Sequence, residues 1–93
     1  MALLAKHMVV HGRVQGVGFR YFVQHVGTRF GLEGYVRNCE DGTVEIVAEG
    51  DARSLTSFIK EVEKGPPMSR VIRVEVHDMP ATGHYSSFQI EGW

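Results

Sequence analysis

Two stretches of the sequence carry apolar side chains at the spacing of an amphipathic α-helix. The first spans residues 20–30, and its apolar positions, with one just before it, are Phe19, Phe22, Val23, Val26 and Phe30. Side chains that recur every three to four positions share one face of a helix. Gly31 follows the last apolar position and is suited to end the helix.

The second stretch, residues 51–64, repeats the pattern with Leu55, Phe58, Ile59 and Val62. Asp51 is suited to cap its first turn, because an aspartate oxygen can accept a hydrogen bond from a first-turn N–H group. Gly65 follows the last turn, and the two prolines after it forbid continuation. We therefore predict two helices, each of which buries one apolar face.

Five other segments have the composition of β-strands, namely residues 6–11, 33–39, 43–49, 71–77 and 86–91. In segment 43–49 the side chains of Val44, Ile46 and Ala48 alternate with those of Glu45, Val47 and Glu49. In segment 71–77 those of Ile72, Val74 and Val76 alternate with those of Arg73, Glu75 and His77, and Phe88 and Ile90 share a face of the last strand. Alternation predicts strands with one apolar face and one polar or half-polar face. The turn Glu40-Asp41-Gly42 predicts a hairpin between the second and third strands.

The predicted order is β-α-β-β-α-β, followed by a short C-terminal strand. A sheet with one exposed face and helices on the other belongs to the α+β class. Right-handed crossovers then give a ferredoxin-like βαββαβ sandwich, with a mostly antiparallel sheet and both helices on one face. We expect residues 1–93 to form a single domain. This fold carries many unrelated functions, so it does not by itself indicate a chemistry.

The charge of the chain limits its partners. Ten basic and eleven acidic residues give a formal net charge of −1, which argues against general electrostatic attraction to nucleic acid or anionic lipid. Any anion-binding site must therefore be local. The sequence has no apolar run of membrane-spanning length and no signal-peptide pattern at its start, and its lone Cys39 has no partner for an internal disulfide. We expect a cytoplasmic monomer that does not bind membranes.

The segment between the first strand and the first helix is rich in glycine and reads Gly-Arg-Val-Gln-Gly-Val-Gly-Phe-Arg over residues 12–20. Glycines let the backbone turn tightly and present its N–H groups, and the start of a helix adds further N–H groups. Arg20 adds a cation whose planar fork suits phosphate oxygens. The segment therefore predicts an anion-binding loop. The alternative is a plain glycine-rich connection in which Arg20 only stabilises a surface turn.

A second candidate is Asn38, near the end of the predicted strand 33–39. In the predicted fold, the later residues of this strand return toward the glycine-rich loop. An uncharged amide therefore lies near that loop. The alternative is that the Asn38 side chain caps the hairpin turn, a common role for asparagine.

The segment 12–20 closely resembles the first signature of the acylphosphatase family. Segment 34–50 resembles the second signature, with Asn38, Gly42, Val44 and Gly50 at the same spacing, and Gly65-Pro66-Pro67 with Arg70-Val71 is similar to the segment after the family's second helix. The resemblance covers nearly the whole chain, with no departure at either functional position. It implies the ferredoxin-like fold and metal-independent hydrolysis of acyl phosphates to a carboxylate and inorganic phosphate.

The resemblance also implies roles for individual residues. Arg20 matches the family's phosphate-binding arginine, and Asn38 matches its water-orienting asparagine. The implied phosphate-binding loop consists of Gln15, Gly16, Val17, Gly18, Phe19 and Arg20. The implied partner is a small-molecule acyl phosphate, with inorganic phosphate or sulfate as a product-like ligand, and no cofactor is implied.

Other reactive side chains have no matching pattern. The five histidines are scattered without zinc-ligand spacing, and although His7 and His11 share a strand face we expect no metal site. Cys39 lies beside Asn38, but without an activating base its thiol stays mostly protonated. We therefore expect no covalent role for Cys39.

Three alternative functions stay open at this point. Residues 18–23 superficially echo the aromatic strand signature of RNA-recognition motifs, but their apolar positions follow a helical period and the net charge is negative. Acylphosphatase-like domains also occur at the N-terminus of larger carbamoyl-transferring maturation enzymes, and the end of this chain at Trp93 leads us to expect the free-standing enzyme. A third alternative is an anion-sensing module without turnover.

Overall fold

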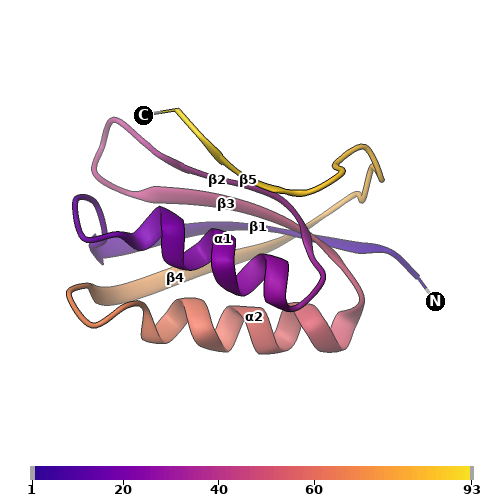
Figure 1. Ribbon diagram of the computed structural model, residues 1–93, viewed down its shortest axis with the longest axis horizontal. Coiled ribbons are helices and arrows are strands. Elements are labelled where there is room, and N and C mark those ends of the chain that lie inside the picture. Colours follow the sequence, from indigo (N-terminus) through magenta and orange to yellow (C-terminus); the bar gives the residue numbers. More distant parts are fainter. Residues whose placement is uncertain (1, 93) are drawn as a thin grey trace.

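A computed structural model describes residues 2–92. Its elements follow the predicted order, and Figure 1 shows both helices lying in front of the sheet. They are β1 (Leu4–Arg13), α1 (Phe19–Arg29), β2 (Glu33–Asn38), β3 (Val44–Gly50), α2 (Ala52–Lys64), β4 (Arg70–Met79) and β5 (Phe88–Glu91). The fold is therefore the predicted α+β arrangement, with most element ends within one or two residues of the predicted ones.

The five strands form one sheet in the order β4-β1-β3-β2-β5. All neighbouring pairs are antiparallel except β2 and β5, which run parallel. The core lies between the sheet and the two helices, and its largest fully buried side chains include Phe19, Phe58, Met8, Ile46 and Leu55. This packing fixes the start of α1 and the end of β2 at the same edge of the sandwich, as Figure 1 shows.

The predicted helix ends are confirmed. The Asp51 side chain accepts a hydrogen bond from the backbone N–H of Ser54 at 2.8 Å, and it caps α2. Gly65 ends α2 with a backbone hydrogen bond to Glu61. At the end of α1, Gly31 has a φ of 71° and donates to the carbonyl of Thr28.

The predicted alternation in β4 is wrong at Ile72. The pairing of β1 with β4 skips this residue, since His11 lies opposite Arg73 and Gly12 lies opposite Val71. Such a bulge places one extra residue on a strand and reverses the alternation beyond it. Val71 and Val74 consequently pack against the core, whereas 74% of Ile72 is exposed.

The face of the sheet opposite the helices is also less exposed than the alternation in β3 predicts. Val47 and Glu49 lie on this face, yet only 1% and 2% of their surfaces are exposed. The segment between β4 and β5 lies over Glu49, because Thr82 and Gly83 donate hydrogen bonds to the Glu49 carboxylate. The connection thus serves as a partial cover for the end of the sheet.

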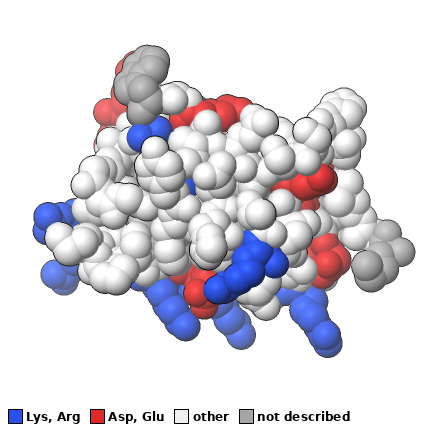
Figure 2. Space-filling view, in the orientation of Figure 1, with Lys and Arg blue, Asp and Glu red and all other residues white. Residues whose placement is uncertain are grey.

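The surface of the helical side carries both signs of charge. Figure 2 shows lysine and arginine side chains projecting mainly along the α2 edge of this face, with carboxylates between them. On α2, Glu61 pairs with Lys64 at 3.5 Å. No helix among residues 2–92 is both long and apolar enough to cross a membrane.

Candidate functional site

The N-terminus of α1 has no side-chain cap. Its N-cap residue, Gly18, has no side chain that accepts a hydrogen bond, and its first turn contains no acidic residue. The first backbone bond of the helix runs from the N–H of Phe22 to the carbonyl of Gly18 at 3.1 Å. The N–H groups of residues 19–21 therefore have no partner within the helix. By contrast, Asp51 caps the first turn of α2.

The loop before α1 takes its shape from glycine. Gly16 has a φ of 73° and Gly18 a φ of 76°, both in the left-handed region that other residues rarely adopt. Left-handed residues alternating with others turn successive backbone N–H groups toward one side and form an anion-binding hollow. The loop and the uncapped helix start thus present N–H groups in the same place, where the helix dipole also favours negative charge.

A pocket of about 210 Å³ lies at this loop. It is lined by Val14, Gly16, Gly18, Phe19, Arg20, Tyr21 and Asn38. The structure thus brings Arg20 and Asn38 to one pocket, as the sequence predicts. Gly16, Gly18 and Phe19 of the predicted loop also line it, whereas Gln15 and Val17 do not. The pocket is smaller than the usual volume of drug-sized ligand sites, which suits a small ligand.

Arg20 has no carboxylate partner among residues 2–92, unlike three other arginines of the chain. Arg29, Arg37 and Arg73 each pair with a glutamate. Within residues 2–92, no carboxylate lies within ion-pair distance of the Arg20 guanidinium. Arg20 is half-buried in the first turn of α1 and keeps its donors for another anion.

Asn38, the last residue of β2, has an unusual side chain. Its Oδ1 atom is buried and has no hydrogen-bond partner among the described residues. Buried polar atoms of this kind are rare in folded proteins, and each one requires an explanation. Asn38 also lines an adjoining, more open hollow of about 500 Å³. Asn38 therefore borders both hollows.

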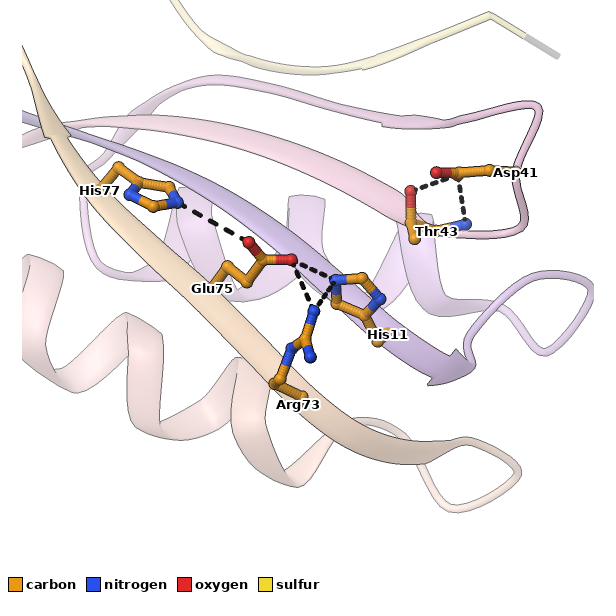
Figure 3. Close-up of polar contacts among 6 residues, drawn as sticks. All are labelled: His11, Asp41, Thr43, Arg73, Glu75 and His77. Atoms are coloured by element: carbon orange, nitrogen blue, oxygen red, sulfur yellow. Dashed lines mark hydrogen bonds and ion pairs between the residues drawn. The ribbon is translucent and has the colours of Figure 1, made fainter.

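The hairpin turn does not use the Asn38 side chain. Figure 3 shows that Asp41 caps the turn instead. Its Oδ1 accepts hydrogen bonds from the backbone N–H of Thr43 at 3.0 Å and from the Thr43 hydroxyl at 2.6 Å. These bonds hold the pKa of the Asp41 carboxyl below its usual value. The alternative role of Asn38 as a turn cap is thus not supported.

Gln15 makes a contact that sequence reasoning missed. Its side-chain Nε2 donates to the carbonyl oxygens of Cys39 and Thr43 at 2.8 and 2.9 Å. The side chain therefore points to the β2–β3 turn, while the backbone of the same residue belongs to the glycine-rich loop. No local pattern indicates such a contact, because its partners lie in a different hairpin.

The histidines of the sheet pair with carboxylates on the face opposite the helices. Figure 3 shows Glu75 of β4 accepting from His11 and Arg73, with His77 at 3.9 Å. The His11 hydrogen bond, and then that of Arg73, lower the pKa of Glu75. His7 pairs with Glu45 at 2.8 Å. Within residues 2–92, no three such side chains gather closely enough to hold a metal ion.

The aromatic residues after the loop do not form a base-stacking platform. Phe19 is buried in the core, and Phe22 packs against it on α1 with ring centroids 6.1 Å apart. RNA-recognition motifs carry their stacking aromatics on the exposed face of a sheet. The RNA-binding alternative thus loses its main sequence argument.

The chain is similar to known proteins over nearly its whole length. The family model for acylphosphatase matches residues 6–90. An acylphosphatase of Bacillus pumilus is 44% identical over 92% of this chain and 96% of its own length. The crystal structure of acylphosphatase from Bacillus subtilis superposes with a TM-score of 0.92 at 43% identity, covering 96% of this chain and 99% of that one. HypF of T. kodakarensis superposes with a TM-score of 0.84 at 38% identity, covering 96% of this chain but 12% of that one.

Proposed function

The chain belongs to the acylphosphatase family and is an enzyme of that kind, and we propose how its residues carry the reaction. Arg20 and the backbone N–H groups of the loop from Gln15 to Arg20 bind the phosphoryl group. Asn38 orients the water molecule that attacks phosphorus. The products are a carboxylate and inorganic phosphate, and the reaction requires no metal ion.

One observation carries this proposal. A single small pocket is lined by Arg20, which has no carboxylate partner among residues 2–92, by the uncapped start of α1, and by Asn38, whose Oδ1 has no hydrogen-bond partner among the same residues. The first two features suit a phosphate dianion, and the third suits a water molecule that can donate a hydrogen bond. The start of α2, by contrast, is capped by the Asp51 side chain.

The chemistry asks little of the protein beyond positioning and charge. The leaving group of an acyl phosphate is a carboxylate whose conjugate acid has a pKa of about 4, so it departs without receiving a proton. Phosphoryl transfer depends mostly on alignment and on stabilisation of the equatorial oxygens. Arg20 and the loop N–H groups supply that stabilisation, since they are fixed before the reaction begins.

Asn38 acts on the attacking water. Its Oδ1 accepts a hydrogen bond from the water and directs a lone pair of the water oxygen toward phosphorus. An amide has no basic site at neutral pH, so it does not remove the proton. The proton passes instead to an oxygen of the substrate's own phosphoryl group.

The proposal is tested by hydrolysis of benzoyl phosphate in the presence of a chelator. We expect turnover that a chelator does not reduce, with inorganic phosphate as a competitive inhibitor because it occupies the same loop. Loss of activity with chelator, restored by an added divalent cation, would contradict the metal-independent mechanism. Binding of phosphate without any turnover would favour the anion-sensing alternative.

A further inference from the structure

Gln15 joins two parts of the active site that are distant in sequence. Its side-chain amide lies in the connection after β1 and donates to the carbonyls of Cys39 and Thr43, on either side of the β2–β3 turn. We propose that Gln15 is a positioning residue that fixes the Asn38 amide relative to the phosphate-binding loop. This inference rests on the proposed roles of Arg20 and Asn38.

The two carbonyls that Gln15 contacts also close the turn. The Cys39 carbonyl accepts from the N–H of Gly42 at 3.2 Å, and the Thr43 carbonyl accepts from the N–H of Cys39 at 2.9 Å. A carbonyl oxygen has two lone pairs, so each of these oxygens takes one bond within the turn and one from Gln15. The two hydrogen bonds donated by the Gln15 amide thus stabilise the turn and also attach it to the loop.

Asn38 depends on this attachment because its own side chain is not held at Oδ1. The amide is placed by the backbone at the end of β2, and Cys39 is the next residue. On the loop side, Val14 is 1% exposed and anchors the chain next to Gln15 in the core. Gln15 therefore connects a buried anchor of the loop to the residue that follows Asn38.

The arrangement also separates the Gln15 side chain from phosphate binding, which the proposed function assigns to the loop backbone and Arg20. Both N–H groups of its side-chain amide donate hydrogen bonds to backbone carbonyls, and Gln15 does not line the small pocket. Removal of the side chain leaves Arg20 and the loop N–H groups in place to bind phosphate. It loosens the hairpin that carries Asn38, and misplacement of a reacting group by about 1 Å can cost on the order of 100-fold in rate.

The test is a double-mutant cycle of Q15A, N38A and the combined variant, assayed with benzoyl phosphate. We expect Q15A to lower kcat by about 10- to 100-fold while the inhibition constant of phosphate changes less than about threefold. In the N38A background we expect Q15A to change kcat less than about twofold, because the group it positions is gone. Gln24→Ala is the matched control, since it removes a 3.1 Å bond from α1 to the Phe88 carbonyl away from the pocket.

Independent effects of Q15A and N38A on kcat would overturn the inference and leave the roles of Arg20 and Asn38 standing. Unchanged turnover of the N38A single variant would overturn both the role of Gln15 and the proposed role of Asn38. A second variant does not depend on the folding of Q15A. In Q15E the carboxylate faces two carbonyl oxygens without a proton to donate, and protonation restores one bond.

The kcat of Q15E relative to the original chain should therefore rise as pH falls from 7, with a midpoint above the usual glutamate pKa of about 4.3. Q24E is the control for this profile, and its relative kcat should stay constant because it lies away from the pocket. A relative kcat of Q15E that does not change with pH would overturn the inference.

Discussion

Arg20 and Asn38 line one pocket, although Arg20 lies in the first turn of α1 and Asn38 is the last residue of β2. The start of α1 and the end of β2 lie at the same end of the sandwich, because β2 runs back along the sheet after α1 (Figure 1). A cation and a neutral amide at one pocket allow two separate tasks. In the proposed mechanism the cation holds the phosphoryl group, and the amide acts on the nucleophile.

Replacement of Arg20 should affect both binding and turnover. We expect Arg20→Ala to lower kcat by about 100-fold or more and to weaken inhibition by phosphate, because the guanidinium stabilises charge in both the bound state and the transition state. Arg20→Lys should recover only part of this loss, since an ammonium cannot bind two oxygens at once. The measurements are kcat, KM and the phosphate inhibition constant.

Arg29→Ala is the matched control, because Arg29 lies at the other end of α1 and pairs with Glu61 at 4.0 Å. Near-normal turnover by Arg20→Ala would contradict the assignment of the anion-binding site to this pocket.

Replacement of Asn38 should act mainly on kcat. We expect Asn38→Ala to lower kcat by about 100-fold with KM little changed, because the water is oriented only in the reacting complex. Asn38→Asp keeps the size of the side chain but adds a negative charge beside the phosphoryl group, so it should raise KM as well. Steady-state kinetics of both variants separates the two effects. A rise in KM alone for Asn38→Ala would assign the amide to substrate binding.

Local patterns in the sequence account for the helices and their ends. The apolar stripes predict α1 and α2, and the Asp51 cap is confirmed because a cap depends on residues within one turn. The bulge at Ile72 has no such local cause. It depends on how β4 pairs with β1, and the apolar-polar alternation of β4 taken alone predicts a regular strand.

The site divides in the same way. A resemblance to known motifs points to Arg20 and Asn38, and the structure brings both to one pocket. The contact of Gln15 with the β2–β3 turn escaped prediction, because its partners are backbone carbonyls, which carry no mark in the sequence. The burial of Glu49 escaped it too, since an alternating glutamate usually faces solvent and only the connection before β5 covers it.

Tyr35 should titrate unusually late. Burial, followed by the nearby charge and hydrogen bond of Glu45, raises the pKa of its phenol to about 12 from a usual value of 10.0. A raised pKa in the folded state stabilises the fold below pH 10, and this contribution is lost as pH rises through about 12. Ultraviolet titration of tyrosinate should show one late phase that is missing in Tyr35→Phe.

Glu45→Gln should move this late phase to lower pH, because it removes the carboxylate that accepts from the Tyr35 hydroxyl at 3.3 Å. A late phase that survives in Tyr35→Phe would belong to another tyrosine and contradict the assignment.

Glu49 should matter for stability rather than for catalysis. Its buried carboxylate accepts from the N–H of Thr82 at 2.8 Å, from the Thr82 hydroxyl at 3.2 Å and from the N–H of Gly83 at 3.0 Å. Glu49→Ala removes these three hydrogen bonds, and because Thr82 and Gly83 are exposed their donors can turn to water, so each lost bond costs about 0.5–1.5 kcal/mol. We expect urea denaturation to show a fall of about 3 kcal/mol in the free energy of unfolding, with kcat nearly unchanged.

Glu49→Gln should cost less, because the amide keeps one oxygen acceptor. Thr82→Ala serves as the matched control from the other side of the contact. It removes the hydroxyl bond to Glu49 and the bond that the hydroxyl accepts from the N–H of His84, but it keeps both backbone bonds to the carboxylate, so its loss should be smaller than that of Glu49→Ala. If Glu49→Ala were no less stable than Thr82→Ala, the backbone bonds to the carboxylate would not hold the connection before β5. Contacts other than these hydrogen bonds would then have to account for the burial of Val47 and Glu49.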